Sequence, residues 1–162
     1  MADVNVPFSI SVTVNGVRYV RLVRPNQLLV EFLHDDLELH GTRNGCSQGV
    51  CGCCTGLLDG EPAKACLVLA PQVDGGAVTT IEGLAPAGAL HPMQTAFVEA
   101  GAVQCGYCIP GMVMTAAAFL EENPRPTDVE IRDALANNIC RCTGYMKIVE
   151  AVKIAAARGG DA

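Results

Sequence analysis

Nine of the 162 residues in this chain are cysteines, whose thiols can bind metals or take part in redox reactions. The stretch GCSQGVCGCCTG, residues 45–56, carries Cys46, Cys51, Cys53 and Cys54, and Cys66 follows it. Cys46-x4-Cys51-x2-Cys54 with a later fourth cysteine is the spacing of plant-type [2Fe–2S] sites. The glycines of the loop leave the space and the free backbone amides that a cluster needs. We therefore predict that Cys46, Cys51, Cys54 and Cys66 hold a [2Fe–2S] cluster.

Cys53 is the surplus thiol of this loop. If Cys53 were the third ligand, the spacing would be x4 and then x1, and its side chain would point away from the side that Cys54 faces. The plant-type spacing selects Cys54 instead. We interpret Cys53 as a small buried apolar residue rather than as a redox-sensing thiol.

Four further cysteines form a second group near the end of the chain. They are the pair Cys105-x2-Cys108 in QCGYC and the pair Cys140-x-Cys142 in NICRCTGY. Two short pairs of this kind suit an iron–sulfur cluster, but they also suit a structural zinc site with four thiolate ligands. Spacing alone leaves both metals open.

Composition excludes several functions. The net charge is −6, and no basic cluster suggests a nucleic-acid partner. We see no signal peptide, and the most apolar stretch, GMVMTAAAFL, is too short to cross a membrane. We expect a cytoplasmic protein, in which cysteines serve metal or redox sites rather than disulfides. The three histidines are isolated, and no motif indicates a catalytic residue, so we expect a chain that moves electrons.

The first half of the chain has the pattern of strands and turns. ISVTVNGVRYVRLV alternates around Asn15-Gly16, which predicts a hairpin. NQLLVEFLHDDLEL, residues 26–39, has apolar residues at helical spacing. TGLL and PAKACLVL around Asp59-Gly60 predict a second hairpin, and AVTTIEGL predicts a last strand. This set of elements indicates a β-grasp sheet.

The second half is expected to be helical. GLAPAGALHP, residues 83–92, has the composition of a linker. Helices are expected to begin at Pro92, at Pro110, after the capping box of Thr127 and Glu130, and at about Gly144. We predict an α+β fold, with a β-grasp, plant-ferredoxin-like [2Fe–2S] domain over residues 1–84. A four-helix bundle that binds the second site follows over residues 85–162.

The order of four motifs resembles one family. GCSQGVCGCCTG, KACL, QCGYCIPGM and NNICRCTGY together are similar to the iron–sulfur subunits of the molybdenum hydroxylases. That family includes xanthine dehydrogenase, aldehyde oxidoreductase, carbon monoxide dehydrogenase and 4-hydroxybenzoyl-CoA reductase. The resemblance extends from about Ile10 to Ala157.

The resemblance implies two [2Fe–2S] clusters in an electron-transfer subunit of an oxidoreductase complex. Cys105, Cys108, Cys140 and Cys142 would then hold the cluster nearer to molybdenum, and the ferredoxin-like cluster would lie nearer to flavin. The implied partners are a large subunit with molybdopterin cytosine dinucleotide and a medium subunit with FAD, assembled as a dimer of heterotrimers. The substrate would be chosen by the large subunit.

The resemblance extends to single residues near the two cysteine groups. Gln104 and Cys142 match residues that contact the pterin in family members. Cys53 departs from the family, which usually has a small residue such as Ala between the second and third ligands of the first cluster. Two other functions remain open: a free two-cluster ferredoxin, and a structural zinc-binding interaction module.

Overall fold

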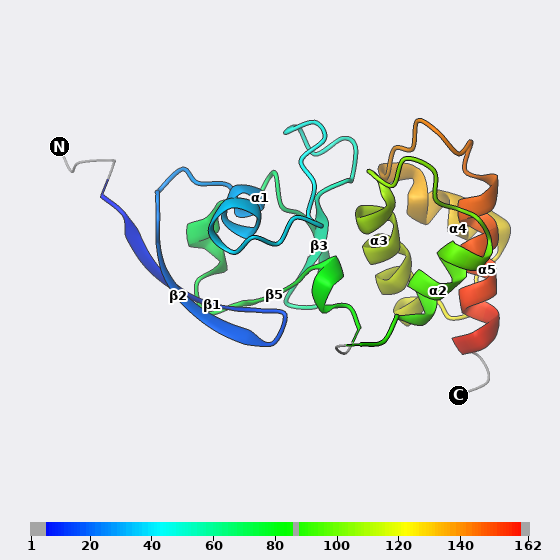
Figure 1. Ribbon diagram of the computed structural model, residues 1–162, viewed down its shortest axis with the longest axis horizontal. Helices are drawn as coiled ribbons and strands as arrows, with labels where there is room; N and C mark the ends of the chain where they lie inside the picture. Colours follow the sequence, from blue (N-terminus) through cyan, green and yellow to red (C-terminus); the bar gives the residue numbers. More distant parts are fainter. Residues whose placement is uncertain (1–5, 86–87, 160–162) are drawn as a thin grey trace.

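The computed structural model describes residues 6–85 and 88–159, which form two lobes that lie side by side (Figure 1). The strands and the first short helix make up the N-terminal lobe, and the longer helices make up the C-terminal lobe. The chain therefore has the expected α+β fold.

A mixed sheet of five strands forms the N-terminal lobe. Its strand order is β2-β1-β5-β3-β4, in which β1 and β5 are parallel and the other neighbours are antiparallel. The strands are β1 (Phe8–Val14), β2 (Val17–Val23), β3 (Thr55–Leu58), β4 (Glu61–Lys64) and β5 (Ala77–Thr79).

Both predicted hairpins are present. Asn15 and Gly16 have φ angles of 51° and 79°, and Asp59 and Gly60 have 51° and 91°, as type I′ turns require. The second hairpin is shorter than predicted, because β4 ends at Lys64 and the residues over 65–69 leave the strand. A turn closed by the Leu67 amide on the Lys64 carbonyl, at 2.8 Å, ends it.

The predicted helix over residues 26–39 is also shorter than expected. It consists of α1 (Leu29–Glu31) and the π-helical turn η1 (Phe32–Asp36). Leu29, Phe32 and Leu33 are buried in the core of this lobe, as their helical spacing predicted. The helical path does not continue to residue 39, because Glu38 takes a left-handed backbone conformation with φ of 56°.

Four α-helices lie in the described part of the C-terminal half. They are α2 (Pro92–Glu99), α3 (Ile109–Glu122), α4 (Asp128–Ala134) and α5 (Met146–Gly159). The predicted capping box opens α4, since Thr127 accepts from the Glu130 amide and the Glu130 carboxylate accepts from the Thr127 amide. The last helix begins at Met146 rather than Gly144, because Gly144 and Tyr145 both have positive φ angles. Short 3-10 turns complete the described elements: η2 (Ala70–Val73), η3 (Ile81–Gly83) and η4 (Leu135–Asn137).

Each lobe has its own apolar core. Strands β1 and β5 and the short helix enclose one core, which includes Ile10 and Phe32. The four α-helices enclose the other, which includes Phe97 and Met112 and takes in Cys53 from the N-terminal half. Two separate cores agree with a division into two domains, but the boundary between residues 84 and 85 stays a prediction.

Residues 86 and 87 of the predicted linker lie outside the described residues. Within residues 6–85 and 88–159, none of the helices combines the length and the apolar character that crossing a membrane requires.

Candidate metal centres

The β3–β4 hairpin brings Cys54 and Cys66 together. Thr55 pairs with Lys64 in the sheet, so the residues just outside this pair meet at the open end of the hairpin. The Ala65 amide donates to the Cys54 carbonyl at 3.2 Å, and both thiols are buried. Burial raises the pKa of the Cys54 thiol to about 12, and the adjacent Cys66 thiol contributes to this rise. A buried pair of this kind is suited to bind metal, which would replace the thiol protons.

Cys46 and Cys51 form a second pair in the same loop, and both are partly exposed. The backbone amides of Cys51 and Gln48 each donate to the Cys46 sulfur at 3.4 Å. These hydrogen bonds, with the Cys51 thiol beside them, lower the pKa of Cys46 to about 6. The loop therefore favours a thiolate at Cys46 before any metal binds.

Cys53 lies in the core of the helical lobe, with 5% of its surface exposed. Burial, together with the neighbouring Cys51 thiol, raises its pKa to about 12. Its position agrees with the interpretation of Cys53 as a core residue. The choice of Cys54 over Cys53 as a ligand stays a prediction.

The four C-terminal cysteines also approach one another in pairs. Cys142 and Cys105 are exposed, and their sulfur atoms lie 3.5 Å apart. Cys108 and Cys140 are buried, and burial followed by the adjacent Cys140 thiol raises the pKa of Cys108 to about 12. Cys105 and Cys108 precede α3, whereas Cys140 and Cys142 follow η4. The cysteines come together because the loops at these two helix ends meet.

A network of hydrogen bonds shapes the loop over residues 138–145. The Tyr145 hydroxyl accepts from the Cys140 amide at 2.9 Å and donates to the Asn138 carbonyl at 3.2 Å. The Thr143 hydroxyl donates to the Cys140 sulfur at 3.0 Å. Burial acts to raise the pKa of Cys140, but the hydrogen bonds from Thr143, together with those from the Cys142 amide and the Cys108 thiol, lower it overall.

The two cysteine loops touch each other through their backbones. The Ile139 amide donates to the Cys51 carbonyl at 2.9 Å, and the buried Asn138 side chain donates to the Gly52 carbonyl at 3.2 Å. Gly111 of α3 packs against the same turn, where a Cβ atom would lie 2.1 Å from the Gly52 carbonyl oxygen. A single hydrogen bond therefore joins Cys51 to Ile139, the residue that directly precedes Cys140.

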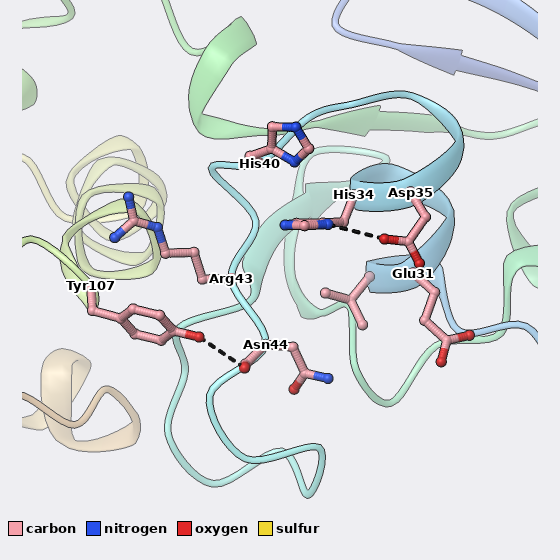
Figure 2. A pocket seen from close by; sticks show the side chains of 8 residues that line it. Glu31, His34, Asp35, His40, Arg43, Asn44 and Tyr107 are labelled. Atoms are coloured by element: carbon pink, nitrogen blue, oxygen red, sulfur yellow. Dashed lines mark hydrogen bonds and ion pairs between the residues drawn. The ribbon is translucent and has the colours of Figure 1, made fainter.

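A second contact between the loops involves residues that no sequence motif pairs. Tyr107 lies between Cys105 and Cys108, and its hydroxyl donates to the Asn44 carbonyl at 2.9 Å (Figure 2). Arg43 donates to the Gly106 carbonyl at 3.0 Å and places its guanidinium 5.4 Å from the centre of the Tyr107 ring. These residues border an open cavity of about 410 Å³, whose other side is formed by residues of α1 and η1.

Gln104 is exposed and directly precedes the exposed Cys105 in the chain. In the described parts of the chain, no group of three or more His, Cys, Asp or Glu side chains is arranged around a single ion. The cysteines meet two by two instead. Of the histidines, His91 caps α2 by accepting from the Met93 amide.

Comparisons with known proteins agree with this architecture. Residues 80–153 match the [2Fe-2S] binding domain family. The small FeS subunit of nicotinate dehydrogenase from Eubacterium barkeri is 46% identical over 150 residues, which cover 93% of this chain and 96% of that subunit.

Solved structures of related proteins have the same fold. A chain of quinoline 2-oxidoreductase from Pseudomonas putida 86 superposes with a TM-score of 0.89 at 43% identity, covering 94% of this chain and 98% of that one. The aldehyde oxidoreductase from Desulfovibrio desulfuricans superposes with a TM-score of 0.90 at 42% identity, but this chain covers only 17% of it.

A mixed sheet and a helical lobe, each carrying cysteine pairs at a loop, define an iron–sulfur electron-transfer protein. The chain belongs to the small iron–sulfur subunits of the molybdenum hydroxylase family, as the motifs indicated. It is therefore a subunit of an oxidoreductase complex that transfers electrons.

Proposed function

We propose that this chain holds two [2Fe–2S] clusters and passes electrons between a molybdopterin site and FAD on partner subunits. The observation that carries the proposal is that eight cysteines lie in pairs, on loops of the two lobes that are hydrogen-bonded to each other. In this proposal the helical half forms a four-helix bundle around its cluster, and the sheet forms a plant-ferredoxin-like domain.

The donor sets fit the clusters. Cys46 with Cys51 and Cys54 with Cys66 would supply two thiolates to each iron of the first cluster. Cys105 with Cys142 and Cys108 with Cys140 would do the same for the second. Thiolates are the ligands that iron in these clusters takes, whereas structural zinc takes four ligands around one ion. Each cluster, when bound, supplies one-electron transfer.

The chain's own residues then provide the route between the two sites. The Cys51 carbonyl accepts from the Ile139 amide, so the two ligand loops are linked without side chains in between. Gln104 and Cys142 would contact the molybdopterin, which their shared exposed position beside Cys105 permits. The second cluster would thus lie nearer to molybdenum and the first nearer to flavin.

Exposed apolar side chains beside both loops support a place inside a complex. Val50 and Leu67 are 57% and 62% exposed next to the first loop. Val103 and Ile139 are 44% and 46% exposed next to the second. Apolar side chains exposed beside these loops would be covered by partner subunits. The partners in this proposal are the molybdopterin-binding and FAD-binding subunits, in a dimer of heterotrimers.

Purification of the tagged chain from its native cells tests this function. We expect a red-brown complex that contains flavin, molybdenum and pterin together with iron. A brown protein that purifies alone, without flavin or molybdenum, would instead favour a free two-cluster ferredoxin. A colourless zinc protein would favour a structural module.

A further inference from the structure

We propose that Thr143 is a positioning residue that sets the reduction potential of the second cluster by donating a hydrogen bond to Cys140. This inference rests on the proposed function, since it assumes that Cys140 binds a cluster. Thr143 itself is not among the predicted ligands.

The direction of the hydrogen bond follows from the neighbours of the Thr143 hydroxyl. Its oxygen accepts from the Tyr145 amide at 3.2 Å. A hydroxyl has one proton to donate, and the Cys140 sulfur lies 3.0 Å from the oxygen. The proton is therefore directed at the sulfur. The Thr143 backbone amide also faces the same sulfur, at 3.5 Å.

The surrounding loop holds this geometry in place. Tyr145 has a left-handed backbone with φ of 69°, which folds the chain back over Cys140. Its hydroxyl binds the Cys140 amide and the Asn138 carbonyl, and Asn138 is buried. The Thr143 side chain thus cannot turn away without leaving the Tyr145 amide unpaired.

The position of Cys140 makes such a donor effective. Only 8% of Cys140 is exposed, whereas Cys142 at the same site is exposed. Water therefore screens the Cys140 sulfur weakly, and a fixed dipole acts on it strongly. Reduction adds a negative charge to the cluster, and a donor to a ligand sulfur stabilises that charge. The Thr143 hydroxyl should accordingly raise the reduction potential of the second cluster.

Potentiometric titration followed by EPR tests this inference on the purified complex. Wild type, Thr143→Val and Thr143→Ser are compared, and iron content is measured in each. We expect Thr143→Val to shift the reduction equilibrium of the second cluster about tenfold toward the oxidised form, which is about 59 mV for a one-electron couple. Thr143→Ser keeps the hydroxyl and should restore the wild-type value. The first cluster in the same sample is the internal control and should not move.

Two outcomes would overturn the inference. One is an unchanged potential of the second cluster in a Thr143→Val protein with full iron content. The other is loss of the second cluster in both Thr143→Val and the smaller Thr143→Ala, which would make Thr143 a residue needed for assembly. Absence of a second [2Fe–2S] signal in wild type would instead refute the proposed function itself, so the two failures are distinguishable.

Discussion

Adjacent cysteines with different surroundings occur at residues 53 and 54. Cys54 lies at the end of the β3–β4 hairpin beside Cys66, whereas Cys53 packs into the core of the other lobe. The side chains of neighbouring residues point in opposite directions, so one loop can serve both lobes. The position of Cys53 agrees with its interpretation as a buried core residue, and the assignment of Cys54 as the metal ligand stays a prediction.

The first prediction concerns this pair. Cys53→Ala should keep both clusters and lower the free energy of unfolding by about 1 kcal/mol, because it removes one buried sulfur atom. Cys54→Ala should lose the first cluster. Iron analysis and EPR of the two purified variants measure the difference. Loss of the first cluster in the Cys53→Ala protein would show that Cys53 was wrongly assigned as the cysteine that does not bind the cluster.

At the scale of elements, α3 packs against the first cysteine loop at Gly111. A Cβ atom there would lie 2.1 Å from the Gly52 carbonyl oxygen, and backbone cannot yield as a flexible side chain can. We expect Gly111→Ala to lower the free energy of unfolding by about 1–3 kcal/mol. Gly159→Ala is the matched control, since nothing lies within 4 Å of its Cβ position. Chemical denaturation of both variants measures this change. A Gly111→Ala protein as stable as wild type would contradict the described packing.

The capping box of α4 gives a prediction for pH. Hydrogen bonds from the Thr127 backbone and side chain lower the pKa of Glu130. Because the folded-state pKa lies below the unfolded one, the stabilisation is present above the unfolded pKa and is lost as pH falls through the folded pKa.

Thermal unfolding of Thr127→Ala and Glu130→Gln tests the capping box. Thr127→Ala should lower the free energy of unfolding by about 1 kcal/mol at neutral pH. Glu130→Gln should lose stability relative to wild type above about pH 5, and this difference should shrink in acid. A difference that stays constant with pH would mean that the Glu130 charge does not contribute.

Local signals in the sequence predicted much of the fold. Both type I′ hairpins, the capping box and the approximate starts of four helices followed from residues whose backbone preferences act over a few positions. The ends of η1 and β4 were missed, because Glu38 adopts a left-handed backbone and a turn follows Lys64 at points that no glycine, proline or asparagine marks in the sequence. The cysteine motifs predicted two groups of four ligands, which stays a prediction, and the thiols lie in pairs within these groups. Nothing local indicated that Asn138 or Tyr107 would join the two loops.

At the scale of the whole molecule, two sets of hydrogen bonds join the lobes beside the cysteine loops, in addition to the packing of α3 at Gly111. Asn138 and Ile139 bind the turn at Cys51 and Gly52, and Tyr107 with Arg43 binds the chain before Cys46. The lobes therefore meet where electrons would pass between clusters. In the proposed relay, the same residues would fix both the packing of the lobes and the separation of the two clusters.

The hydrogen bond of Tyr107 can be tested by a substitution that removes only its hydroxyl oxygen. Tyr107→Phe removes the hydroxyl that donates to the Asn44 carbonyl but keeps the ring beside Arg43. We expect a loss of about 1 kcal/mol in the free energy of unfolding, measured by denaturant titration. Tyr19→Phe, on the distant β1–β2 hairpin, is the control. A Tyr107→Phe protein as stable as wild type would show that this hydrogen bond does not contribute.

The central claim is that one chain carries two [2Fe–2S] clusters. Iron analysis combined with EPR of the dithionite-reduced complex tests it most directly. We predict about four irons per chain and two distinct S = 1/2 signals. About two irons and one signal, with zinc present, would contradict the claim, because the helical lobe would then hold a structural metal and no relay to molybdenum could pass through it.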